Sequence, residues 1–174
     1  MDGIVNVMKP AGMTSHDVVA KLRRVYHTKK VGHTGTLDPD AVGVLPVCVG
    51  QATRLVEYFT EKDKTYKVIM QFGTETNTQD ASGEVTVTTE LPSLSKAEFV
   101  ALTEQFIGEI QQIPPMYSAI KVEGKKLYEL AREGKVIERK GRPITIHNIV
   151  LHSVETDKGA FSKDVFHFAF CNSL

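Results

Sequence analysis

Residues 32–46 have the sequence GHTGTLDPDAVGVLP, which places a carboxylate, Asp38, among glycine, threonine and proline. The glycines and prolines of this stretch exclude a long helix. Two interpretations are open. An Asp followed by Pro is typical of the start of a turn, because both residues favour turn backbones through local hydrogen bonds and a restricted φ. Alternatively, the loop exists to present the Asp38 carboxylate to a reactant.

The overall composition is that of a globular protein of about one domain, with 174 residues of which 41% are hydrophobic. Cys48 and Cys171 lie far apart, and the six histidines show no H-x-x-x-H or H-E-x-x-H spacing, so we expect no metal site and a reducing compartment. No apolar run approaches the roughly 18 residues of a membrane span. The N-terminal residues do not form a signal peptide, and the cytoplasm is the expected location.

Charge is distributed unevenly although the net charge is zero. Residues 1–67 contain ten Lys and Arg against seven Asp and Glu, residues 68–113 contain one against seven, and residues 114–174 contain ten against seven. Two basic segments therefore flank an acidic one. They would bind a polyanion if they met in space, whereas ordinary solvated surface is the plainer interpretation.

The local patterns predict an α+β protein built around a mainly antiparallel sheet. Apolar alternation and β-branched runs predict strands, and 3.6-residue periodicity predicts helices. The expected strands are 4–10, 43–50, 64–72, 142–154 and 164–170, the last two as antiparallel neighbours. The expected helices are 16–26, 51–59, 125–134 and one that follows a capping box formed by Ser95 and Glu98. Residues 73–85 are expected to form a loop.

The first helix is expected to have an apolar face and a basic face. Ser15 is the expected N-cap. The apolar positions are Val18, Val19, Leu22 and Val25. The basic positions are Lys21, Arg23 and Arg24, with Lys29 and Lys30 soon after. Similarly, the helix after Ser95 is expected to bury Phe99, Leu102 and Phe106.

Several catalytic classes lack their motifs. A serine hydrolase of the G-x-S-x-G type and a phosphate-binding loop of the G-x-x-x-x-G-K-[ST] type are both absent. A metal-free hydrolase that uses Asp38 has little support beyond the carboxylate itself. Taken alone, Tyr66 is a core residue of an alternating strand, and Lys9 with Pro10 is a plain strand terminus.

Five segments in a fixed order change this assessment. They are NVMKPAGMTSHDVV, VGHTGTLDPDAVGVLPVCVGQATR, DKTYKV, GTETNTQDASGEV and QIPPMYSAIKVEGKKLYELAREG. Together they closely resemble the TruB-type tRNA pseudouridine synthases over almost the whole chain. The most specific part is GHTGTLDP followed by GVLPVCVGQATR. The start close to Met1 resembles the stand-alone bacterial enzyme more than the RNA-guided relatives.

The resemblance implies a fold, a reaction and a partner. The fold is that of the pseudouridine synthases, with a mainly antiparallel mixed sheet flanked by helices and loops. The reaction converts uridine to pseudouridine in the T stem-loop of tRNA, at position 55 by tRNA convention. It breaks the N-glycosidic bond, rotates the base and rejoins it through carbon. No metal or organic cofactor is implied.

The resemblance also implies site residues. Asp38 matches the catalytic aspartate, as a nucleophile or as a group that stabilises the detached sugar. Tyr66 matches a tyrosine that stacks on the target base and serves in proton transfer. His33 matches a histidine that accommodates the flipped nucleotide. Lys9 and Pro10 match a motif that supports the active-site loop.

Further RNA contacts are implied around these residues. Gly35, Thr36 and Leu37 belong to the same motif as Asp38, and its glycines let the backbone approach the RNA. Met116, Tyr117 and Ser118 match a motif near the RNA-facing cleft. The basic helix face with Lys21, Arg23 and Arg24 is a candidate for phosphate contacts.

One departure from the family lies at residues 170–174, FCNSL. The family normally continues here through Cys-Ser-Lys-Gly-Thr-Tyr-Ile-Arg, whose arginine pairs with the catalytic aspartate. The resemblance therefore implies that residues 1–174 form a catalytic domain incomplete at its C-terminal end, without the small C-terminal RNA-binding domain. We expect a buried Asp38 without its cation, weak or absent turnover, and self-association through an open edge at the VFHFAF strand. The alternative is a non-catalytic tRNA-binding or RNA-chaperone-like protein.

Overall fold

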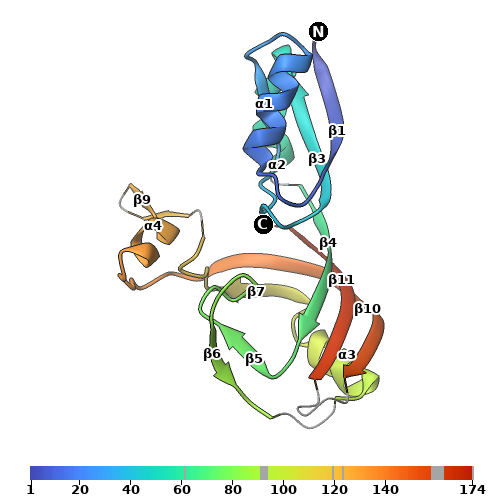
Figure 1. Ribbon diagram of the computed structural model, residues 1–174. Coiled ribbons are helices and arrows are strands. Elements are labelled where there is room, and N and C mark those ends of the chain that lie inside the picture. Colours follow the sequence, from blue (N-terminus) through green and yellow to red (C-terminus); the bar gives the residue numbers. More distant parts are fainter. Residues whose placement is uncertain (61, 91–93, 119, 123, 158–162, 174) are drawn as a thin grey trace. The chain divides into compact units, whose positions relative to one another are not determined.

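The computed structural model describes residues 1–60, 62–90, 94–118, 120–122, 124–157 and 163–173. The chain divides into two compact units, Met1–Lys62 and Asp63–Leu174 (Figure 1). Helices and antiparallel strands occur in both units, which confirms the predicted α+β class. In the described part of the chain, no helix is long and apolar enough to cross a membrane.

The first unit is a three-stranded antiparallel sheet with a helix packed on one face (Figure 1). The strand order is β1-β3-β2. The elements are β1 (Gly3–Lys9), α1 (Ser15–Val25), β2 (Val31–His33), β3 (Gly43–Val49), the 3₁₀ helix η1 (Gly50–Leu55) and α2 (Val56–Thr60). The core between α1 and the sheet consists of valines and one leucine, namely Val18, Val19, Val31, Leu45, Val47 and Val49.

Helix α1 begins with a capping box formed by Thr14 and Asp17. Thr14 Oγ1 accepts a hydrogen bond from the Asp17 N–H at 3.1 Å, and Asp17 Oδ2 accepts one from the Thr14 N–H at 2.9 Å. The prediction that Ser15 caps this helix is therefore wrong, because Ser15 is already the first helical residue. The expected apolar face is also shorter, since Val25 is 65% exposed.

The second unit is built on a four-stranded antiparallel sheet with the order β4-β11-β10-β7 (Figure 1). Its sheet strands are β4 (Lys64–Gln71), β7 (Gly108–Gln112), β10 (Arg142–Asp157) and β11 (Lys163–Ser173). Two strand pairs lie outside this sheet, β5 (Thr74–Thr76) with β6 (Val85–Thr88), and β8 (Lys121–Val122) with β9 (Lys125–Lys126). The helices are α3 (Lys96–Glu104) and α4 (Leu127–Arg132).

Aromatic side chains dominate the core of the second unit. Phe99 of α3 stacks on Phe166 of β11 with ring centroids 4.3 Å apart, and Phe72 meets Phe166 edge to face at 5.1 Å. The predicted capping box of Ser95 and Glu98 is confirmed. The predicted apolar face of the helix after Ser95 is only partly correct, because Phe99 is buried and Leu102 is exposed. Phe106, also exposed, lies beyond the end of α3.

The segment 73–85 was expected to be a loop, and this expectation is wrong at both of its ends. Strand β5 lies within the segment, and β6 begins at its last residue. The turn between them is held by the Asp80 carboxylate, which accepts hydrogen bonds from the hydroxyls of Thr78 and Ser82. This local network closes the chain tightly enough for the flanking residues to pair, although their composition is polar.

Strand β11 lies inside the sheet and contains the VFHFAF segment. It pairs with β10 on one side and with β4 on the other. The prediction that β10 and β11 are antiparallel neighbours is confirmed. The prediction that VFHFAF forms an open edge is wrong, because β4 supplies its second set of hydrogen-bond partners. In the described part of the chain, the edges of this sheet are β4 and β7.

Candidate active site

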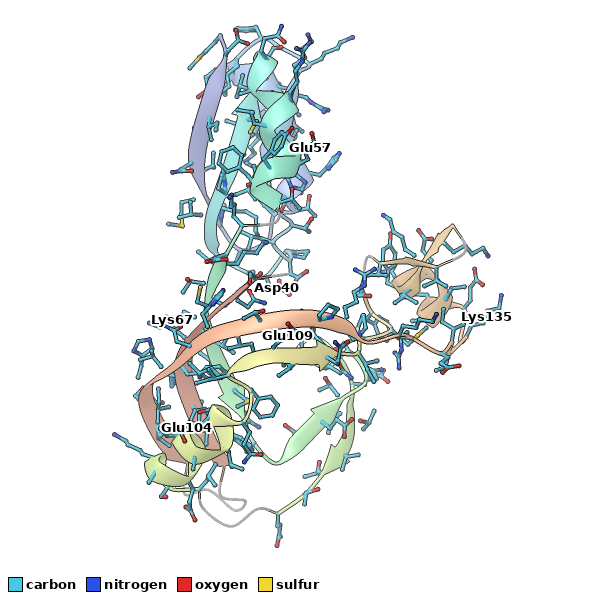
Figure 2. The ribbon with its side chains drawn as sticks, turned by 180° about the vertical axis from the view of Figure 1, so that it is seen from behind. Asp40, Glu57, Lys67, Glu104, Glu109 and Lys135 are labelled. Atoms are coloured by element: carbon cyan, nitrogen blue, oxygen red, sulfur yellow. The ribbon has the colours of Figure 1, made fainter. Side chains whose placement is uncertain are left out.

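Asp38 lies on the loop between β2 and β3 of the first unit, as does Asp40, which is labelled in Figure 2. The Asp38 carbonyl accepts a hydrogen bond from the Ala41 N–H at 3.1 Å, which closes a four-residue turn with Pro39 in its second position. The interpretation of Asp38 as a turn residue is therefore correct for its backbone. Its side chain is exposed, so the expected burial of Asp38 is wrong.

The Asp38 carboxylate forms no hydrogen bond or ion pair with the residues that the structure describes. A carboxylate that serves a turn usually accepts hydrogen bonds from nearby backbone N–H groups, as Asp80 does from the Ser82 N–H at 2.9 Å. The Asp38 side chain thus has no part in holding its own turn. Its charge is available to a molecule that approaches the loop.

Lys9, at the end of β1, is fully buried and anchors the backbone of this loop through hydrogen bonds. Its ammonium group donates hydrogen bonds to the carbonyls of Pro10 at 2.9 Å, Met13 at 2.7 Å and Pro39 at 3.1 Å. Three acceptors satisfy the three N–H donors of the ammonium group. This geometry favours a supporting role for Lys9, because its charge does not reach the surface.

The other motif residues around Asp38 differ in exposure. Leu37 packs against the core of the first unit. Thr36 is exposed and Gly35 is half-buried, so both present surface beside Asp38. Thr34, which precedes them, is buried, and its backbone N–H and side-chain hydroxyl both donate to the Pro46 carbonyl, at 3.1 and 3.3 Å.

His33 ends β2 and is half-buried. Its ring lies edge to face with the ring of His16, with centroids 6.3 Å apart. His33 Nδ1 is buried and has no hydrogen-bond partner among the described residues. His16, in the first turn of α1, was not singled out from the sequence, because a lone histidine after a cap carries no motif.

Tyr66 belongs to the second unit, in β4. Its ring stacks on Phe170 of β11, with centroids 5.2 Å apart and planes inclined by 22°. The side chain is 38% exposed. The plain interpretation as a core residue is only partly correct, because one face of the ring is packed while part of it remains accessible.

Two further groups were expected to contact RNA. The five basic residues on and after α1 are all exposed, and none forms an ion pair with the described residues. They are Lys21, Arg23, Arg24, Lys29 and Lys30. Tyr117 is also exposed and lies between β7 and β8 in the second unit, beside Ser118, whose carbonyl accepts from the Tyr128 N–H at 3.1 Å.

Within the described residues, no group of three or more His, Cys, Asp or Glu side chains lies close enough to hold a metal ion. The structure thus provides two exposed carboxylates without a described partner, Asp38 and Asp40, on an anchored loop in the first unit. In the second unit it provides a partly exposed stacked tyrosine. Asp38 with His33 and Lys9 belong to the first unit, and Tyr66 with Tyr117 to the second.

This fold is that of the pseudouridine synthases. A chain of a solved Cbf5–Nop10–Gar1 complex matches 97% of this chain with a TM-score of 0.64 and 27% sequence identity, over 39% of its own length. A chain of an H/ACA ribonucleoprotein bound to a substrate RNA containing 2′-deoxyuridine shares the fold, with a TM-score of 0.63 and 24% identity.

The sequence comparisons specify the family. The family model described as TruB family pseudouridylate synthase (N terminal domain) matches residues 23–167. The chain therefore belongs to the TruB family, as its motifs predicted. It is 48% identical to tRNA pseudouridine synthase B of Alkaliphilus oremlandii over 178 aligned positions, and 53% identical to that of Listeria monocytogenes over 150.

The length of these relatives exceeds that of the chain. The match covers 100% of the chain and 59% of the Alkaliphilus protein, and 86% of the chain and 49% of the Listeria protein. The chain thus spans about half to three-fifths of the curated relatives that it matches.

Proposed function

We propose that this chain carries the catalytic aspartate of a tRNA pseudouridine synthase that isomerises the T-loop uridine at tRNA position 55. Membership of the TruB family supports this proposal, as do relatives named tRNA pseudouridine synthase B. The observation that carries it is the loop of Asp38. Its backbone is anchored by a buried lysine, whereas its carboxylate has no partner among the described residues.

The arrangement suits a reaction at a glycosidic bond. A carboxylate acts there either as a nucleophile towards the detached sugar or base, or as an anion that stabilises positive charge on the sugar. Both roles require an ionised, accessible oxygen in a fixed position. Because the target base must leave its stack before the bond to the sugar breaks, His33 is proposed to accommodate the flipped nucleotide.

Tyr66 is proposed to stack on the target base and to serve in proton transfer. The remaining contacts are proposed to position the tRNA. The cations of α1 bind phosphates, and Gly35, Thr36 and Leu37 beside Asp38 contact the RNA from the first unit. Tyr117 contacts the RNA from the second unit. This proposal needs no metal or organic cofactor, and it places the protein in the cytoplasm.

The test is a matched pair of substitutions in the same loop, measured in the complete gene product. Asp38→Asn keeps the side-chain size and removes the charge, and Asp40→Asn makes the same change two residues away at another exposed position. Pseudouridine formation in tRNA is followed by tritium release from labelled uridine. Asp38→Asn should abolish turnover and leave tRNA affinity within a few-fold of wild type, whereas Asp40→Asn should remain active.

Two outcomes would count against the proposal. If Asp38→Asn retained about a tenth or more of the wild-type activity, this carboxylate would not be the catalyst. If the wild-type protein bound tRNA without forming pseudouridine, the non-catalytic RNA-binding alternative would replace the enzymatic one.

A further inference from the structure

Ser15 is a buried residue whose hydroxyl is bonded to the backbone of the catalytic loop. Only 3% of its surface is exposed. Ser15 Oγ accepts a hydrogen bond from the Leu37 N–H at 2.9 Å and donates one to the Leu37 carbonyl at 3.2 Å. Leu37 directly precedes Asp38. The cap of α1 is supplied by Thr14, so the helix does not need the hydroxyl of Ser15 for its own N-terminus.

Pro39, the residue after Asp38, is bonded to residues 9–12, which lie just before Ser15 in the sequence. The Pro39 carbonyl accepts hydrogen bonds from the Gly12 N–H at 2.9 Å and from Lys9 Nζ at 3.1 Å. Gly12 has a φ of +79°, a conformation that favours glycine and that turns its N–H towards the loop. Contacts from residues 9–15 thus fix the backbone on both sides of Asp38.

From this arrangement we infer that Ser15 is a positioning residue for the Asp38 carboxylate. The inference rests on the proposed function, because it assigns Ser15 to the reaction of Asp38. The Leu37 carbonyl belongs to the peptide group that ends at the Asp38 nitrogen. The hydrogen bond from Ser15 therefore fixes the orientation of the peptide plane that precedes the Asp38 Cα, and with it the direction of the Asp38 side chain.

The anchoring on the two sides of Asp38 differs in kind. On the Pro39 side two donors share one carbonyl, so the loss of either leaves the other. On the Leu37 side the hydroxyl of Ser15 bonds both the N–H and the C=O. Without it, Leu37 is held by the packing of its side chain, which leaves the rotation of its peptide planes less restricted.

The inference predicts an effect on turnover that exceeds the effect on stability. A misplacement of a reacting group by about 1 Å can lower a rate on the order of a hundredfold. A purely structural hydroxyl would lower the free energy of unfolding and leave the folded enzyme equally fast. Separate measurement of kcat and KM distinguishes a positioning role from a purely structural one. Because Ser15 is too deeply buried to bind tRNA, a positioning role lowers kcat and leaves KM unchanged.

The experiment compares Ser15→Ala with Thr14→Ala in the complete gene product. Ser15→Ala removes both bonds to Leu37, whereas Thr14→Ala removes the cap of the same helix and leaves those bonds intact. We expect kcat of Ser15→Ala to fall about tenfold or more, with KM for tRNA within about twofold of wild type. The Leu37 amide should exchange hydrogen faster than in wild type. Thr14→Ala should keep the wild-type kcat although it is less stable.

Conservative variants complete the test. Ser15→Thr keeps the hydroxyl and should recover most of kcat. Because the extra methyl group can disturb a buried site, Ser15→Cys provides a second comparison. It has nearly the size of serine but forms weaker hydrogen bonds, and its kcat should lie between those of Ser15→Ala and wild type.

The outcomes distinguish this inference from the proposed function. A wild-type kcat in Ser15→Ala or an equal loss of kcat in Thr14→Ala would overturn the inference, while the role of Asp38 would stand. A Ser15→Cys variant no faster than Ser15→Ala, in the absence of rescue by Thr, would also count against it. An inactive wild-type protein, or about a tenth or more of the wild-type activity in Asp38→Asn, would overturn the proposed function and the inference together.

Discussion

Lys9 Nζ lies 3.1 Å from the carbonyl oxygen of Pro39, so a buried lysine at the end of β1 holds the residue that follows Asp38. An ammonium group removed from water is costly unless its donors are satisfied. The carbonyls of Pro10 and Met13 complete its set of acceptors. The loop is thus tied to the sheet by a cation that neutral backbone groups surround.

Replacement of Lys9 by Met should therefore destabilise the first unit. The substitution keeps an unbranched side chain but leaves the carbonyls of Pro10 and Met13 without their donor and the Pro39 carbonyl with only the Gly12 N–H. We expect the free energy of unfolding to fall by about 2 kcal/mol or more. Urea unfolding measures the change. Lys29→Met, at an exposed position without an ion pair to the described residues, should change it by less than about 0.5 kcal/mol. Equal stability of the two variants would show that the buried hydrogen bonds of Lys9 contribute little.

Neutralisation of Arg23 and Arg24 should weaken tRNA binding and reduce its dependence on salt. Both side chains are exposed on α1, where they are available to phosphates. The slope of log affinity against log salt becomes shallower by about one for each phosphate that the protein no longer neutralises, so the double Gln variant should reduce it by about two. The matched double Lys variant keeps both charges and should keep the slope. Unchanged affinity and slope in the Gln variant would remove this face from the RNA-binding surface.

Tyr66→Phe should separate the stacking role of Tyr66 from its hydroxyl role. The phenyl ring can retain the stacked contact with Phe170, so tRNA affinity should stay near wild type. If the hydroxyl transfers a proton in the reaction, kcat should fall about a hundredfold or more. Tyr66→Ala should in addition weaken binding, because it removes the ring. Wild-type turnover in Tyr66→Phe would limit the role of Tyr66 to stacking.

The turn between β5 and β6 should weaken in acid. Hydrogen bonds from the side chains of Ser82 and then Thr78 lower the pKa of Asp80 below its ordinary value of 3.8. A lowered pKa in the folded state means that the stabilisation is complete above about pH 3.8 and is lost as the pH falls through the folded-state pKa. Thermal unfolding of wild type and Asp80→Asn from pH 6 to about pH 2.5 should therefore converge at the acid end. Glu75→Gln, which changes the same charge on β5 outside the turn, should follow the wild-type pH dependence.

The sequence predicted those parts of the structure that depend on short-range patterns. The Ser95 and Glu98 box, the strand β4 and the pairing of β10 with β11 were all correct, because each is encoded within a few residues or one hairpin. The capping of α1 was assigned to the wrong hydroxyl. Thr14 and Ser15 are adjacent and both can cap, and only Thr14 is followed by an acidic residue three positions later.

The long-range parts of the structure could not be derived in this way. No local pattern shows that β4 pairs with β11, so the open edge was placed on the wrong strand. Asp38, Tyr66 and His33 were predicted as site residues through the resemblance to family motifs rather than through periodicity. The contacts of Lys9 and Ser15 with the loop join residues 22 to 30 positions apart, and they became visible only in the folded chain.

The position of β11 between β4 and β10 has a consequence for the order of folding. Gln71 pairs with Val165 and Lys64 pairs with Asn172, so the two strands are 94 to 108 positions apart. During synthesis, β4 emerges early and must wait for β11 before its ladder of hydrogen bonds can form. The sheet of the first unit closes over far shorter separations, since Lys9 pairs with Gly43. Because distant pairings slow folding, the first unit should acquire its protection against hydrogen exchange while β4 is still an unpaired strand that a chaperone can bind.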